Sequence, residues 1–261
     1  MQHRARKRFG QNFLVDDEVV ARIVAVIAPR PGERLVEIGP GLGALTRPLL
    51  ETGARLDVVE LDRDLASTLA HRLGDPPALT IHAADALTFD FAALAADGPL
   101  RVVGNLPYNI STPLLFHLLE QADAIADMHF MLQREVVERL VAGPGRRARG
   151  RLGVMAQLRA TITPLLDVPP DAFRPAPKVD SAVVRLVPKA LSDSQRAHLP
   201  HIEKIARAAF AQKRKTLRNT LAGHLDADTM ASLGIDPQRR AETLTLDEFT
   251  ALAEAAREST S

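Results

Sequence analysis

The sequence of 261 residues contains no cysteine. This absence excludes disulfide bonds, thiolate metal ligands and cysteine nucleophiles, and it is typical of a chain that works in a reducing compartment. The sequence also lacks a signal peptide or a membrane-spanning run, because its best apolar candidate, residues 19–28, is interrupted by Arg22. We therefore expect a cytoplasmic protein that folds as a monomer, with no membrane partner and no metal site.

The net charge of +1 conceals a strong segregation of charge along the chain. Residues 1–8 hold four basic side chains and no acidic one, and residues 174–222 hold eleven basic against three acidic side chains. Residues 223–261, in contrast, hold three basic and eight acidic side chains. Clustered Lys and Arg gain affinity for a polyanion by releasing counterions from its phosphates. The two basic segments therefore favour docking to a polyanion, although either cluster alone is equally well interpreted as solvated surface charge.

Seven short runs rich in apolar and β-branched residues indicate strands. Amphipathic stretches of the length that right-handed crossovers require separate the first five, which favours a parallel, doubly wound sheet. Only a proline-rich loop separates the last two, so we expect these to pair as an antiparallel hairpin at one sheet edge. A helix capped by Asp16 or Asp17 and stopped by Pro29 precedes all of them. The runs cover residues 35–38, 56–60, 79–82, 100–104, 128–132, 161–168 and 181–187.

After Pro188 the pattern becomes helical. Apolar residues between Ile202 and Leu221 recur at helical spacing, and Lys and Arg crowd the remaining positions, so we expect one basic helix here. The chain thus divides into an α/β domain, residues 1–188, and a small all-helical domain, residues 189–261. Residues 143–150, with the sequence Gly-Pro-Gly-Arg-Arg-Ala-Arg-Gly, are expected to form a mobile basic loop.

A glycine-rich motif follows the first of the seven strands and opens a helix. Glycine lets the backbone turn sharply and approach a ligand closely, and Gly39, Gly41 and Ala44 also satisfy the dinucleotide fingerprint G-x-G-x-x-G/A. Glu37 argues against a dinucleotide, because a carboxylate repels a pyrophosphate but attracts a sulfonium or an ammonium group. An ordinary structural turn is the alternative interpretation of these glycines.

Two acidic residues follow the next two strands. Glu60 can accept hydrogen bonds from both hydroxyls of a ribose. Asp85 lies where its carboxylate or the neighbouring backbone could hold an adenine amine. The alternatives are a surface acid for Glu60 and a helix N-cap for Asp85. Together with the glycine-rich motif, these residues predict a nucleoside cofactor.

The fourth strand runs into Asn105-Leu106-Pro107-Tyr108. The exocyclic amine of adenine is a poor nucleophile, because its lone pair is delocalised into the ring. Two acceptors, the Asn105 side-chain oxygen and a main-chain carbonyl near Leu106, can draw its hydrogens out of the ring plane. Pro107 fixes the turn without a competing N–H, and Tyr108 can stack on an extruded base. The motif predicts methyl transfer from S-adenosylmethionine; the alternative is an ordinary turn into a helix, with Ser111 or Thr112 as N-cap and Pro113 at the first helical position.

Several motifs, taken together, resemble the ribosomal RNA small subunit methyltransferase A family, which comprises adenine dimethyltransferases of 16S rRNA. The similarity covers essentially the whole chain except its acidic C-terminal tail. The motifs are residues 6–14, the Gly39 loop, 105–113, 133–137 with 139–144, 175–181 and 210–219.

The resemblance implies a Rossmann-like class I methyltransferase sheet of seven strands with a small C-terminal all-helical domain. It also implies dimethylation of two adjacent adenines in the 3′-terminal hairpin of 16S rRNA, within a partly assembled small ribosomal subunit. S-adenosylmethionine would be the donor and S-adenosylhomocysteine the product. By motif, cofactor contacts are expected from Asn12, Leu14, Gly39, Glu60, Asp85 and Asn105, with weaker indications for Gln11, Glu37 and Gly41.

The resemblance further implies that Tyr108 and Phe173 sandwich the target adenine. Without the resemblance, Phe173 is better interpreted as a core aromatic residue under the proline-rich loop. Unusually many arginines occupy residues 146–151, which can alter the grip on RNA. RNA contacts are expected from Arg6, Lys7, Arg8, Arg146, Arg147, Arg149, Lys213, Arg214, Lys215 and Arg218.

Three other functions compete with this prediction. A 23S rRNA adenine dimethylase that confers macrolide resistance shares the chemistry, but that family typically reads Asn-Ile-Pro-Tyr. A nicotinamide-dependent dehydrogenase explains the glycines and Glu60 but leaves residues 105–108 and the basic segments unused. A mainly non-enzymatic ribosome-assembly factor would use the basic segments alone.

Overall fold

The computed structural model describes residues 12–107 and 109–258. The chain forms two compact units, Met1–Val137 with Ile162–Pro188, and Glu138–Thr161 with Lys189–Ser261. The sequence predicts one division, after residue 188. In the structure the chain also changes unit at residues 138 and 162, so that residues 138–161 group with the C-terminal helices.

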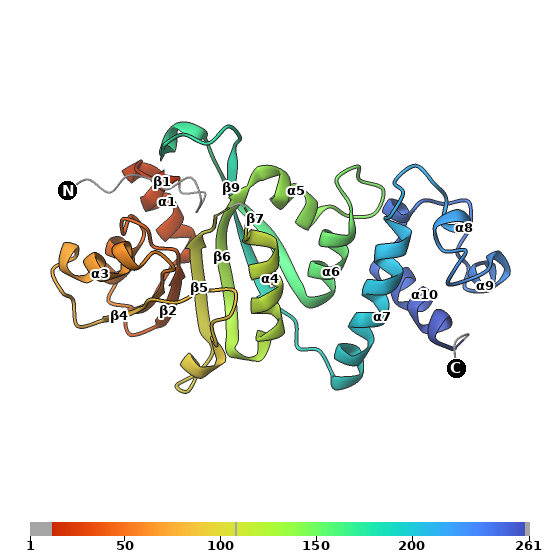
Figure 1. Ribbon diagram of the computed structural model, residues 1–261, viewed down its shortest axis with the longest axis horizontal. Coiled ribbons are helices and arrows are strands. Elements are labelled where there is room, and N and C mark those ends of the chain that lie inside the picture. The colour runs from red at the N-terminus through yellow and green to blue at the C-terminus, as the bar shows by residue number, and fades with distance from the viewer. Residues whose placement is uncertain (1–11, 108, 259–261) are drawn as a thin grey trace. The chain divides into compact units, whose positions relative to one another are not determined.

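The first unit is built on a seven-stranded sheet with the strand order β4-β3-β2-β5-β6-β9-β7. Strands β4, β3, β2, β5 and β6 run parallel, and β9 pairs with β6 in the antiparallel sense. Figure 1 shows these strands as one twisted sheet. The seven predicted strands and the final antiparallel hairpin are confirmed. The strands are β2 (Arg34–Ile38), β3 (Arg55–Val59), β4 (Leu79–His82), β5 (Leu100–Asn105), β6 (Ile125–Gln133), β7 (Ala160–Val168) and β9 (Ser181–Pro188).

The first helix, α1 (Asp17–Ile27), begins as its sequence predicts. The Asp16 carboxylate accepts hydrogen bonds from the main-chain N–H groups of Glu18 and Val19, which satisfies two donors that the first turn leaves unpaired. The helix ends at Ala28, in the left-handed conformation, immediately before Pro29. The further helical elements between β2 and β9 are α2 (Thr46–Glu51), α3 (Arg63–Arg72), η2 (Ala92–Leu94), α4 (Ser111–Glu120), η3 (Ala122–Ala124), α5 (Arg134–Val141), α6 (Arg151–Arg159) and η4 (Pro170–Ala172).

The start of α4 differs from the prediction. Ile110 is the N-cap residue and no side chain caps the helix, so the predicted cap at Ser111 or Thr112 is wrong. Pro113 is the third helical residue rather than the first. Proline costs no hydrogen bond at this position, because N–H groups in the first turn have no intrahelical partner.

A small second sheet fixes the beginning of the described chain. Strand β1 (Phe13–Leu14) pairs antiparallel with β8 (Phe173–Arg174), and Leu14 lies opposite Phe173. Both of these side chains are buried in the hydrophobic core between α1 and the seven-stranded sheet. Two strands of two residues give no periodic signal, so the sequence did not predict this pairing.

The second unit is helical. Helix α7 (Asp193–Ala209) begins with a capping box formed by Ser192 and Gln195. It packs against α10 (Leu246–Glu258), where the ring of Phe210 stacks on Phe249 with centroids 5.7 Å apart. The remaining helical elements of this unit are α8 (Leu217–Thr220), α9 (Ala227–Ser232) and η5 (Ala241–Thr243).

The prediction of one basic helix through residues 202–221 is wrong. Helix α7 ends at Ala209, and residues 213–215 lie in the turn that precedes α8. The main-chain N–H groups of Leu217 and Arg218 donate to the carbonyls of Arg239 and Pro237, not to carbonyls one helical turn earlier. Hydrogen bonds to residues distant in sequence thus replace the intrahelical hydrogen bonds that a continuous helix would need.

Among the residues that the structure describes, no helix combines the length and the apolar character needed to cross a membrane.

We predict that Gly104→Ala destabilises the first unit. A Cβ atom added at Gly104 would lie 2.6 Å from the carbonyl oxygen of Ile38, a backbone atom of the neighbouring strand β2. Relieving this overlap requires the two central strands to separate, at a cost of about 1–3 kcal/mol or more. Urea denaturation should show a lower midpoint with an unchanged slope. Gly223→Ala, where an added Cβ meets no atom within 4 Å, is the matched control and should leave the midpoint in place.

Candidate functional site

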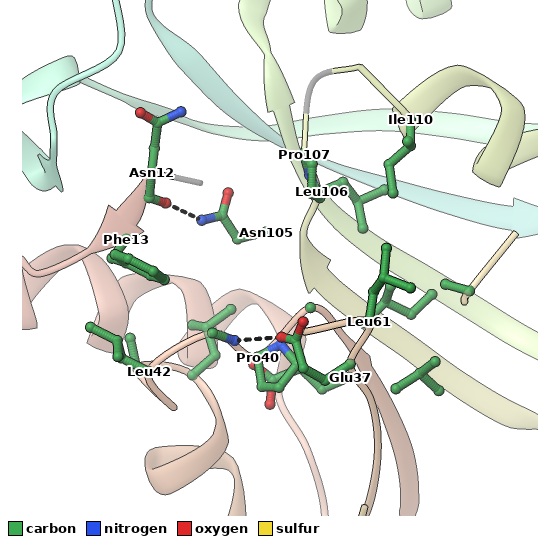
Figure 2. Close-up of a pocket in the computed structure, with 18 of the residues that line it drawn as sticks. Asn12, Phe13, Glu37, Pro40, Leu42, Leu61, Asn105, Leu106, Pro107 and Ile110 are labelled. Carbon is green, nitrogen blue, oxygen red and sulfur yellow. Dashed lines mark hydrogen bonds between the residues drawn. The ribbon is translucent and has the colours of Figure 1, made fainter. Parts of the chain in front are cut away.

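A cavity of about 360 Å³ opens at the carboxyl ends of the parallel strands β2, β3 and β5. It lies where the strand order reverses, with β3 and β4 on one side of β2 and β5 and β6 on the other, the usual ligand site of open α/β sheets. Its size suits a small-molecule cofactor. Figure 2 shows most of the lining residues. The lining consists of Asn12, Phe13, Leu14, Glu37, Ile38, Gly39, Pro40, Gly41, Leu42, Ala44, Leu45, Val59, Glu60, Leu61, Ala84, Asp85, Ala86, Asn105, Leu106, Pro107, Asn109 and Ile110.

The glycine-rich loop forms one wall of this cavity. Gly39 and Gly41 have φ angles of 66° and 57°, a left-handed conformation that only glycine adopts at little cost. A Cβ added at Gly41 would lie 3.1 Å from the ring of Phe13, so this ring packs directly against the loop. The sharp turn expected at these glycines is therefore present.

Glu37 is buried at the base of the cavity, with 2% of its surface exposed. Among the described residues its Oε2 atom has no hydrogen-bond partner. Burial raises the pKa of Glu37 to about 7; the nearby Thr46 hydroxyl opposes this rise and the charge of Glu60 adds to it. An unpaired, buried carboxyl that lines a cavity favours a cationic ligand group.

Glu60 is held rigidly at the end of β3. One carboxylate oxygen accepts from the main-chain N–H of Asp62 at 2.8 Å, and the other accepts from Gly41 at 3.3 Å. Burial raises the pKa of Glu60, and these two main-chain donors counteract the rise. The side chain thus bridges the glycine-rich loop and β3, and it retains lone pairs for the hydroxyls of a ligand.

Asp85 lies in the cavity lining three residues beyond β4. Its Oδ1 atom accepts from the main-chain N–H of Leu87 at 2.9 Å, which makes a local turn. No helix starts here, so the alternative interpretation as a helix N-cap is excluded.

Asn105 ends the central strand β5 directly beside the glycine-rich loop. Its Nδ2 atom donates to the main-chain carbonyl of Asn12 at 3.1 Å, as Figure 2 shows. Among the described residues Oδ1 makes no hydrogen bond. Leu106 follows as a buried residue whose N–H donates to Met131, and Pro107 completes the turn. The structure therefore brings the three described residues of the predicted catalytic motif into the cavity; Tyr108 lies outside the described residues.

Several lining residues were missed by the sequence-based prediction. Phe13 packs on the glycine-rich loop, and Asn109 and Ile110 continue the catalytic turn. Leu42 and Leu61 are apolar yet 40% and 50% exposed, which is expected of side chains that pack against a ligand. Position could have indicated Leu61, because it directly follows the predicted ribose-binding acid.

Phe173 does not line the cavity. Its side chain is 0% exposed and packs in the core with Leu14 and Val168. The prediction that it stacks on the target adenine is not supported, because neither face of the ring is accessible. The core interpretation, which follows from the sequence without the family resemblance, describes its position correctly.

The predicted RNA contacts separate into exposed, buried and undescribed residues. Arg149 is 2% exposed, and its guanidinium donates to the carbonyl of Ala142 at 2.8 Å and to Gln157 at 3.2 Å. Burial without a carboxylate partner lowers its pKa. Arg149 therefore organises the 143–150 segment from within and is not available to RNA. Arg146, Arg147, Lys213, Arg214, Lys215 and Arg218 are exposed on the second unit, and Arg6, Lys7, Arg8 and Gln11 lie outside the described residues.

The part of the chain that the structure describes contains no group of three or more His, Cys, Asp or Glu side chains that could hold a metal ion. The cavity instead offers carboxyl and amide groups on an apolar lining.

Comparisons with known proteins point to one family. The family described as ribosomal RNA adenine dimethylase matches residues 2–258. Relatives named ribosomal RNA small subunit methyltransferase A include those of Laribacter hongkongensis, 58% identical with 97% of this chain and 96% of the relative covered, and of Thiobacillus denitrificans, 57% identical with 96% and 97% covered.

Solved structures show the same architecture. A dimethyladenosine transferase from Plasmodium falciparum is similar with a TM-score of 0.77 at 24% identity, covering 92% of this chain and 95% of that one. The 23S rRNA methyltransferase ErmE is similar with a TM-score of 0.72 at 28% identity, covering 94% of this chain and 100% of that one.

We predict that the protein without added cofactor loses stability as the pH rises, because of Glu37. The pKa of this carboxyl is 4.5 ordinarily and about 7 in the folded chain. The folded state therefore binds more protons than the unfolded state between these values. Relative to Glu37→Gln, the free energy of unfolding should fall by about 3 kcal/mol as the pH rises through this window.

Denaturant unfolding of both chains at about pH 5 and about pH 8 measures this difference. Glu51→Gln, at an exposed position, is the control; it retains Glu37 and should therefore follow the pH dependence of wild type. A difference between wild type and Glu37→Gln that stays constant with pH would contradict the assignment.

Proposed function

The chain belongs to the ribosomal RNA adenine dimethylase family, and on this premise we propose that it dimethylates two adjacent adenines of the 3′-terminal hairpin of 16S rRNA. The observation that carries the proposal is the placement of Asn105. Asn105 lines the same cavity as Glu37 and Glu60, and its Oδ1 makes no hydrogen bond to the residues that the structure describes. A cofactor site and an acceptor for an amine thus share one space. The relatives at 57–58% identity carry the small-subunit name, which favours 16S rRNA over 23S rRNA, whereas the ErmE structure is only 28% identical.

The lining residues fit S-adenosylmethionine. Glu60 would accept from the ribose hydroxyls, and Asp85 with its neighbouring backbone would hold the adenine amine. The unpaired oxygen of Glu37 suits a cationic group, and the glycine-rich loop allows close approach of the ligand. Asn12 and Leu14 would close the cavity on the N-terminal side. When bound, this cofactor supplies a methyl group on a sulfonium sulfur and leaves as S-adenosylhomocysteine.

Asn105 would then activate the target amine. Its oxygen accepts one N6 hydrogen, and a main-chain carbonyl near Leu106 accepts the other, so that the nitrogen lone pair turns out of the ring plane toward the methyl group. No strong base is needed, because the N6 proton becomes acidic once the new N–C bond has formed and can leave to water. Positioning supplies most of the acceleration, for which effective molarities of roughly 10⁵–10⁸ M are the relevant scale.

A second transfer to the same nitrogen is compatible with this arrangement. The monomethylated amine retains one hydrogen, and one fixed acceptor is enough to orient it. We keep Tyr108 as the stacking residue for the extruded base, on the strength of its motif. Phe173 is not assigned a role at the base, because its ring is buried.

The second unit would bind the RNA. Arg146 and Arg147 on one segment, and residues 213–215 with Arg218 on another, expose basic side chains. These suit the phosphates of rRNA within the small ribosomal subunit. The protein would then act as a monomeric, cytoplasmic enzyme that takes part in small-subunit biogenesis.

Asn105→Ala should reduce methyl transfer by at least about 10²–10³-fold, because loss of one preoriented polar group in a buried site has an effect of this size. Transfer of labelled methyl groups to unmethylated 16S rRNA in small subunits measures the rate. Binding of the subunit should persist, and Asn219→Ala, on the surface of α8, should behave as wild type. A normal methyl-transfer rate for Asn105→Ala would refute the mechanism. If the wild-type chain bound the subunit without methylating its rRNA, the alternative of a mainly non-enzymatic assembly factor would be favoured.

Replacing Lys213, Arg214 and Lys215 with Gln should weaken subunit binding. Each basic side chain that no longer neutralises a phosphate reduces the number of released counterions by about one, so the dependence of log affinity on log salt should flatten by up to about three units. Titrations at several salt concentrations give this slope. The control replaces three exposed arginines of the first unit, Arg22, Arg55 and Arg63. If both triple variants changed subunit affinity and its salt dependence equally, the net charge of the protein, and not residues 213–215 in particular, would determine binding.

A further inference from the structure

The amide of Asn105 faces a fixed main-chain acceptor. Its Nδ2 atom lies 3.1 Å from the carbonyl oxygen of Asn12, a residue 93 positions earlier in the sequence. Figure 2 shows the two residues side by side at the N-terminal wall of the cavity. A carbonyl oxygen can only accept a hydrogen bond, so the side chain must present its NH2 group there. The orientation of the amide is thereby determined, and Oδ1 is the end left for a substrate.

The Asn12 carbonyl is held in place by the residues that follow it. Leu14 pairs with Phe173 across the β1–β8 sheet, and both side chains are buried in the core. Phe13 packs against the glycine-rich loop at Gly41, with 3.1 Å between its ring and the position of an added Cβ. The acceptor is therefore anchored on two sides and cannot readily turn away from residue 105.

We propose that the main-chain carbonyl of Asn12 is a positioning group that orients the Asn105 amide and restricts position 105 to a side chain able to donate a hydrogen bond. This inference rests on the proposed function, in which Oδ1 of Asn105 accepts from the target amine. Asn12 acts through Asn105 and does not itself touch the reacting atoms.

The need for a hydrogen-bond donor distinguishes asparagine from aspartate at position 105. For the amine alone, a carboxylate oxygen is as good an acceptor as an amide oxygen. At position 105, however, a carboxylate would direct an oxygen at the Asn12 carbonyl, and two acceptors without a hydrogen between them repel each other. A protonated carboxyl removes the conflict, because its O–H donates to Asn12 and its C=O remains for the amine. It has the same shape and the same donor and acceptor arrangement as the amide.

The test is the pH dependence of Asn105→Asp. Near pH 8 its methyl-transfer rate should be about 100-fold or more below wild type. The ratio of the variant's rate to the wild-type rate should rise on the order of tenfold per pH unit as the pH falls toward about 6, because one proton restores the donor. Asn105→Ala, which has no donor at any pH, should show a flat ratio. Taking ratios removes the titration of groups common to all three chains.

Titratable groups around the site strengthen the expected trend. Among the described residues, Glu37, Glu60 and Asp85 line the same cavity, and no Lys, Arg or His does. Arg174, a basic residue, lies opposite Phe13 in the β1–β8 pair. Three neighbouring acids disfavour a further negative charge, so the introduced carboxyl should retain its proton well above the usual range.

A second measurement does not depend on catalysis. In Asn105→Asp labelled with ¹³C-aspartate, the carboxyl signal absent from wild type should titrate well above the ordinary pKa of about 3.9. A normal melting curve establishes that the variant is folded. A variant as active as wild type at pH 8, a rate ratio that stays flat with pH, or an ordinary titration of the new carboxyl would each overturn the proposal. If wild type itself fails to methylate adenine, the proposed function is wrong, while an ordinary titration of the new carboxyl would still contradict the contact with Asn12.

Discussion

The close approach of the central strands β2 and β5 is the constraint on which the site depends. Glu37 lies opposite Val103 in the parallel register, so the next residues along each strand, Ile38 and Gly104, meet where only a hydrogen atom fits between the backbones. This contact delivers Asn105 directly beside the glycine-rich loop. Because β2 and β5 flank the reversal of the strand order, the cavity forms at the carboxyl ends of both strands.

The charge of the cavity matches that of a cationic ligand. Three carboxyl groups line it, and among the described lining residues no basic side chain balances them. Burial raises the pKa of Glu37 and of Glu60, so these carboxyls resist full ionisation, and a positively charged cofactor would relieve this cost. The exposed basic side chains of residues 146–147 and 213–218 belong to the other unit. The acidic cavity and the exposed basic side chains therefore lie on separate parts of the chain.

The short N-terminal strand connects these features. Residues 12–14 supply an acceptor to the Asn105 amide, a ring that covers the glycine-rich loop, and an apolar side chain that reaches the core. One small element thus links the glycine-rich loop to Asn105. The burial of Phe173 has its explanation here, because its pairing with Leu14 anchors this strand.

The sequence by itself determined the seven strands, the glycine-rich loop, and the positions of Glu60 and Asn105 at strand ends. These features depend on local signals: apolar periodicity, turn residues and spacing. Tertiary structure alone decided that Arg149 is buried, that the basic segment 213–215 is not helical, and that Asn12 bonds Asn105. The deciding partners of the last two are distant in sequence: the carbonyls of Pro237 and Arg239 for α8, and Asn12 for Asn105. The core position of Phe173, in contrast, was one of the two interpretations that the sequence offered. Local patterns specify which conformation a segment favours, whereas burial and hydrogen-bond partners depend on which segments the fold brings together.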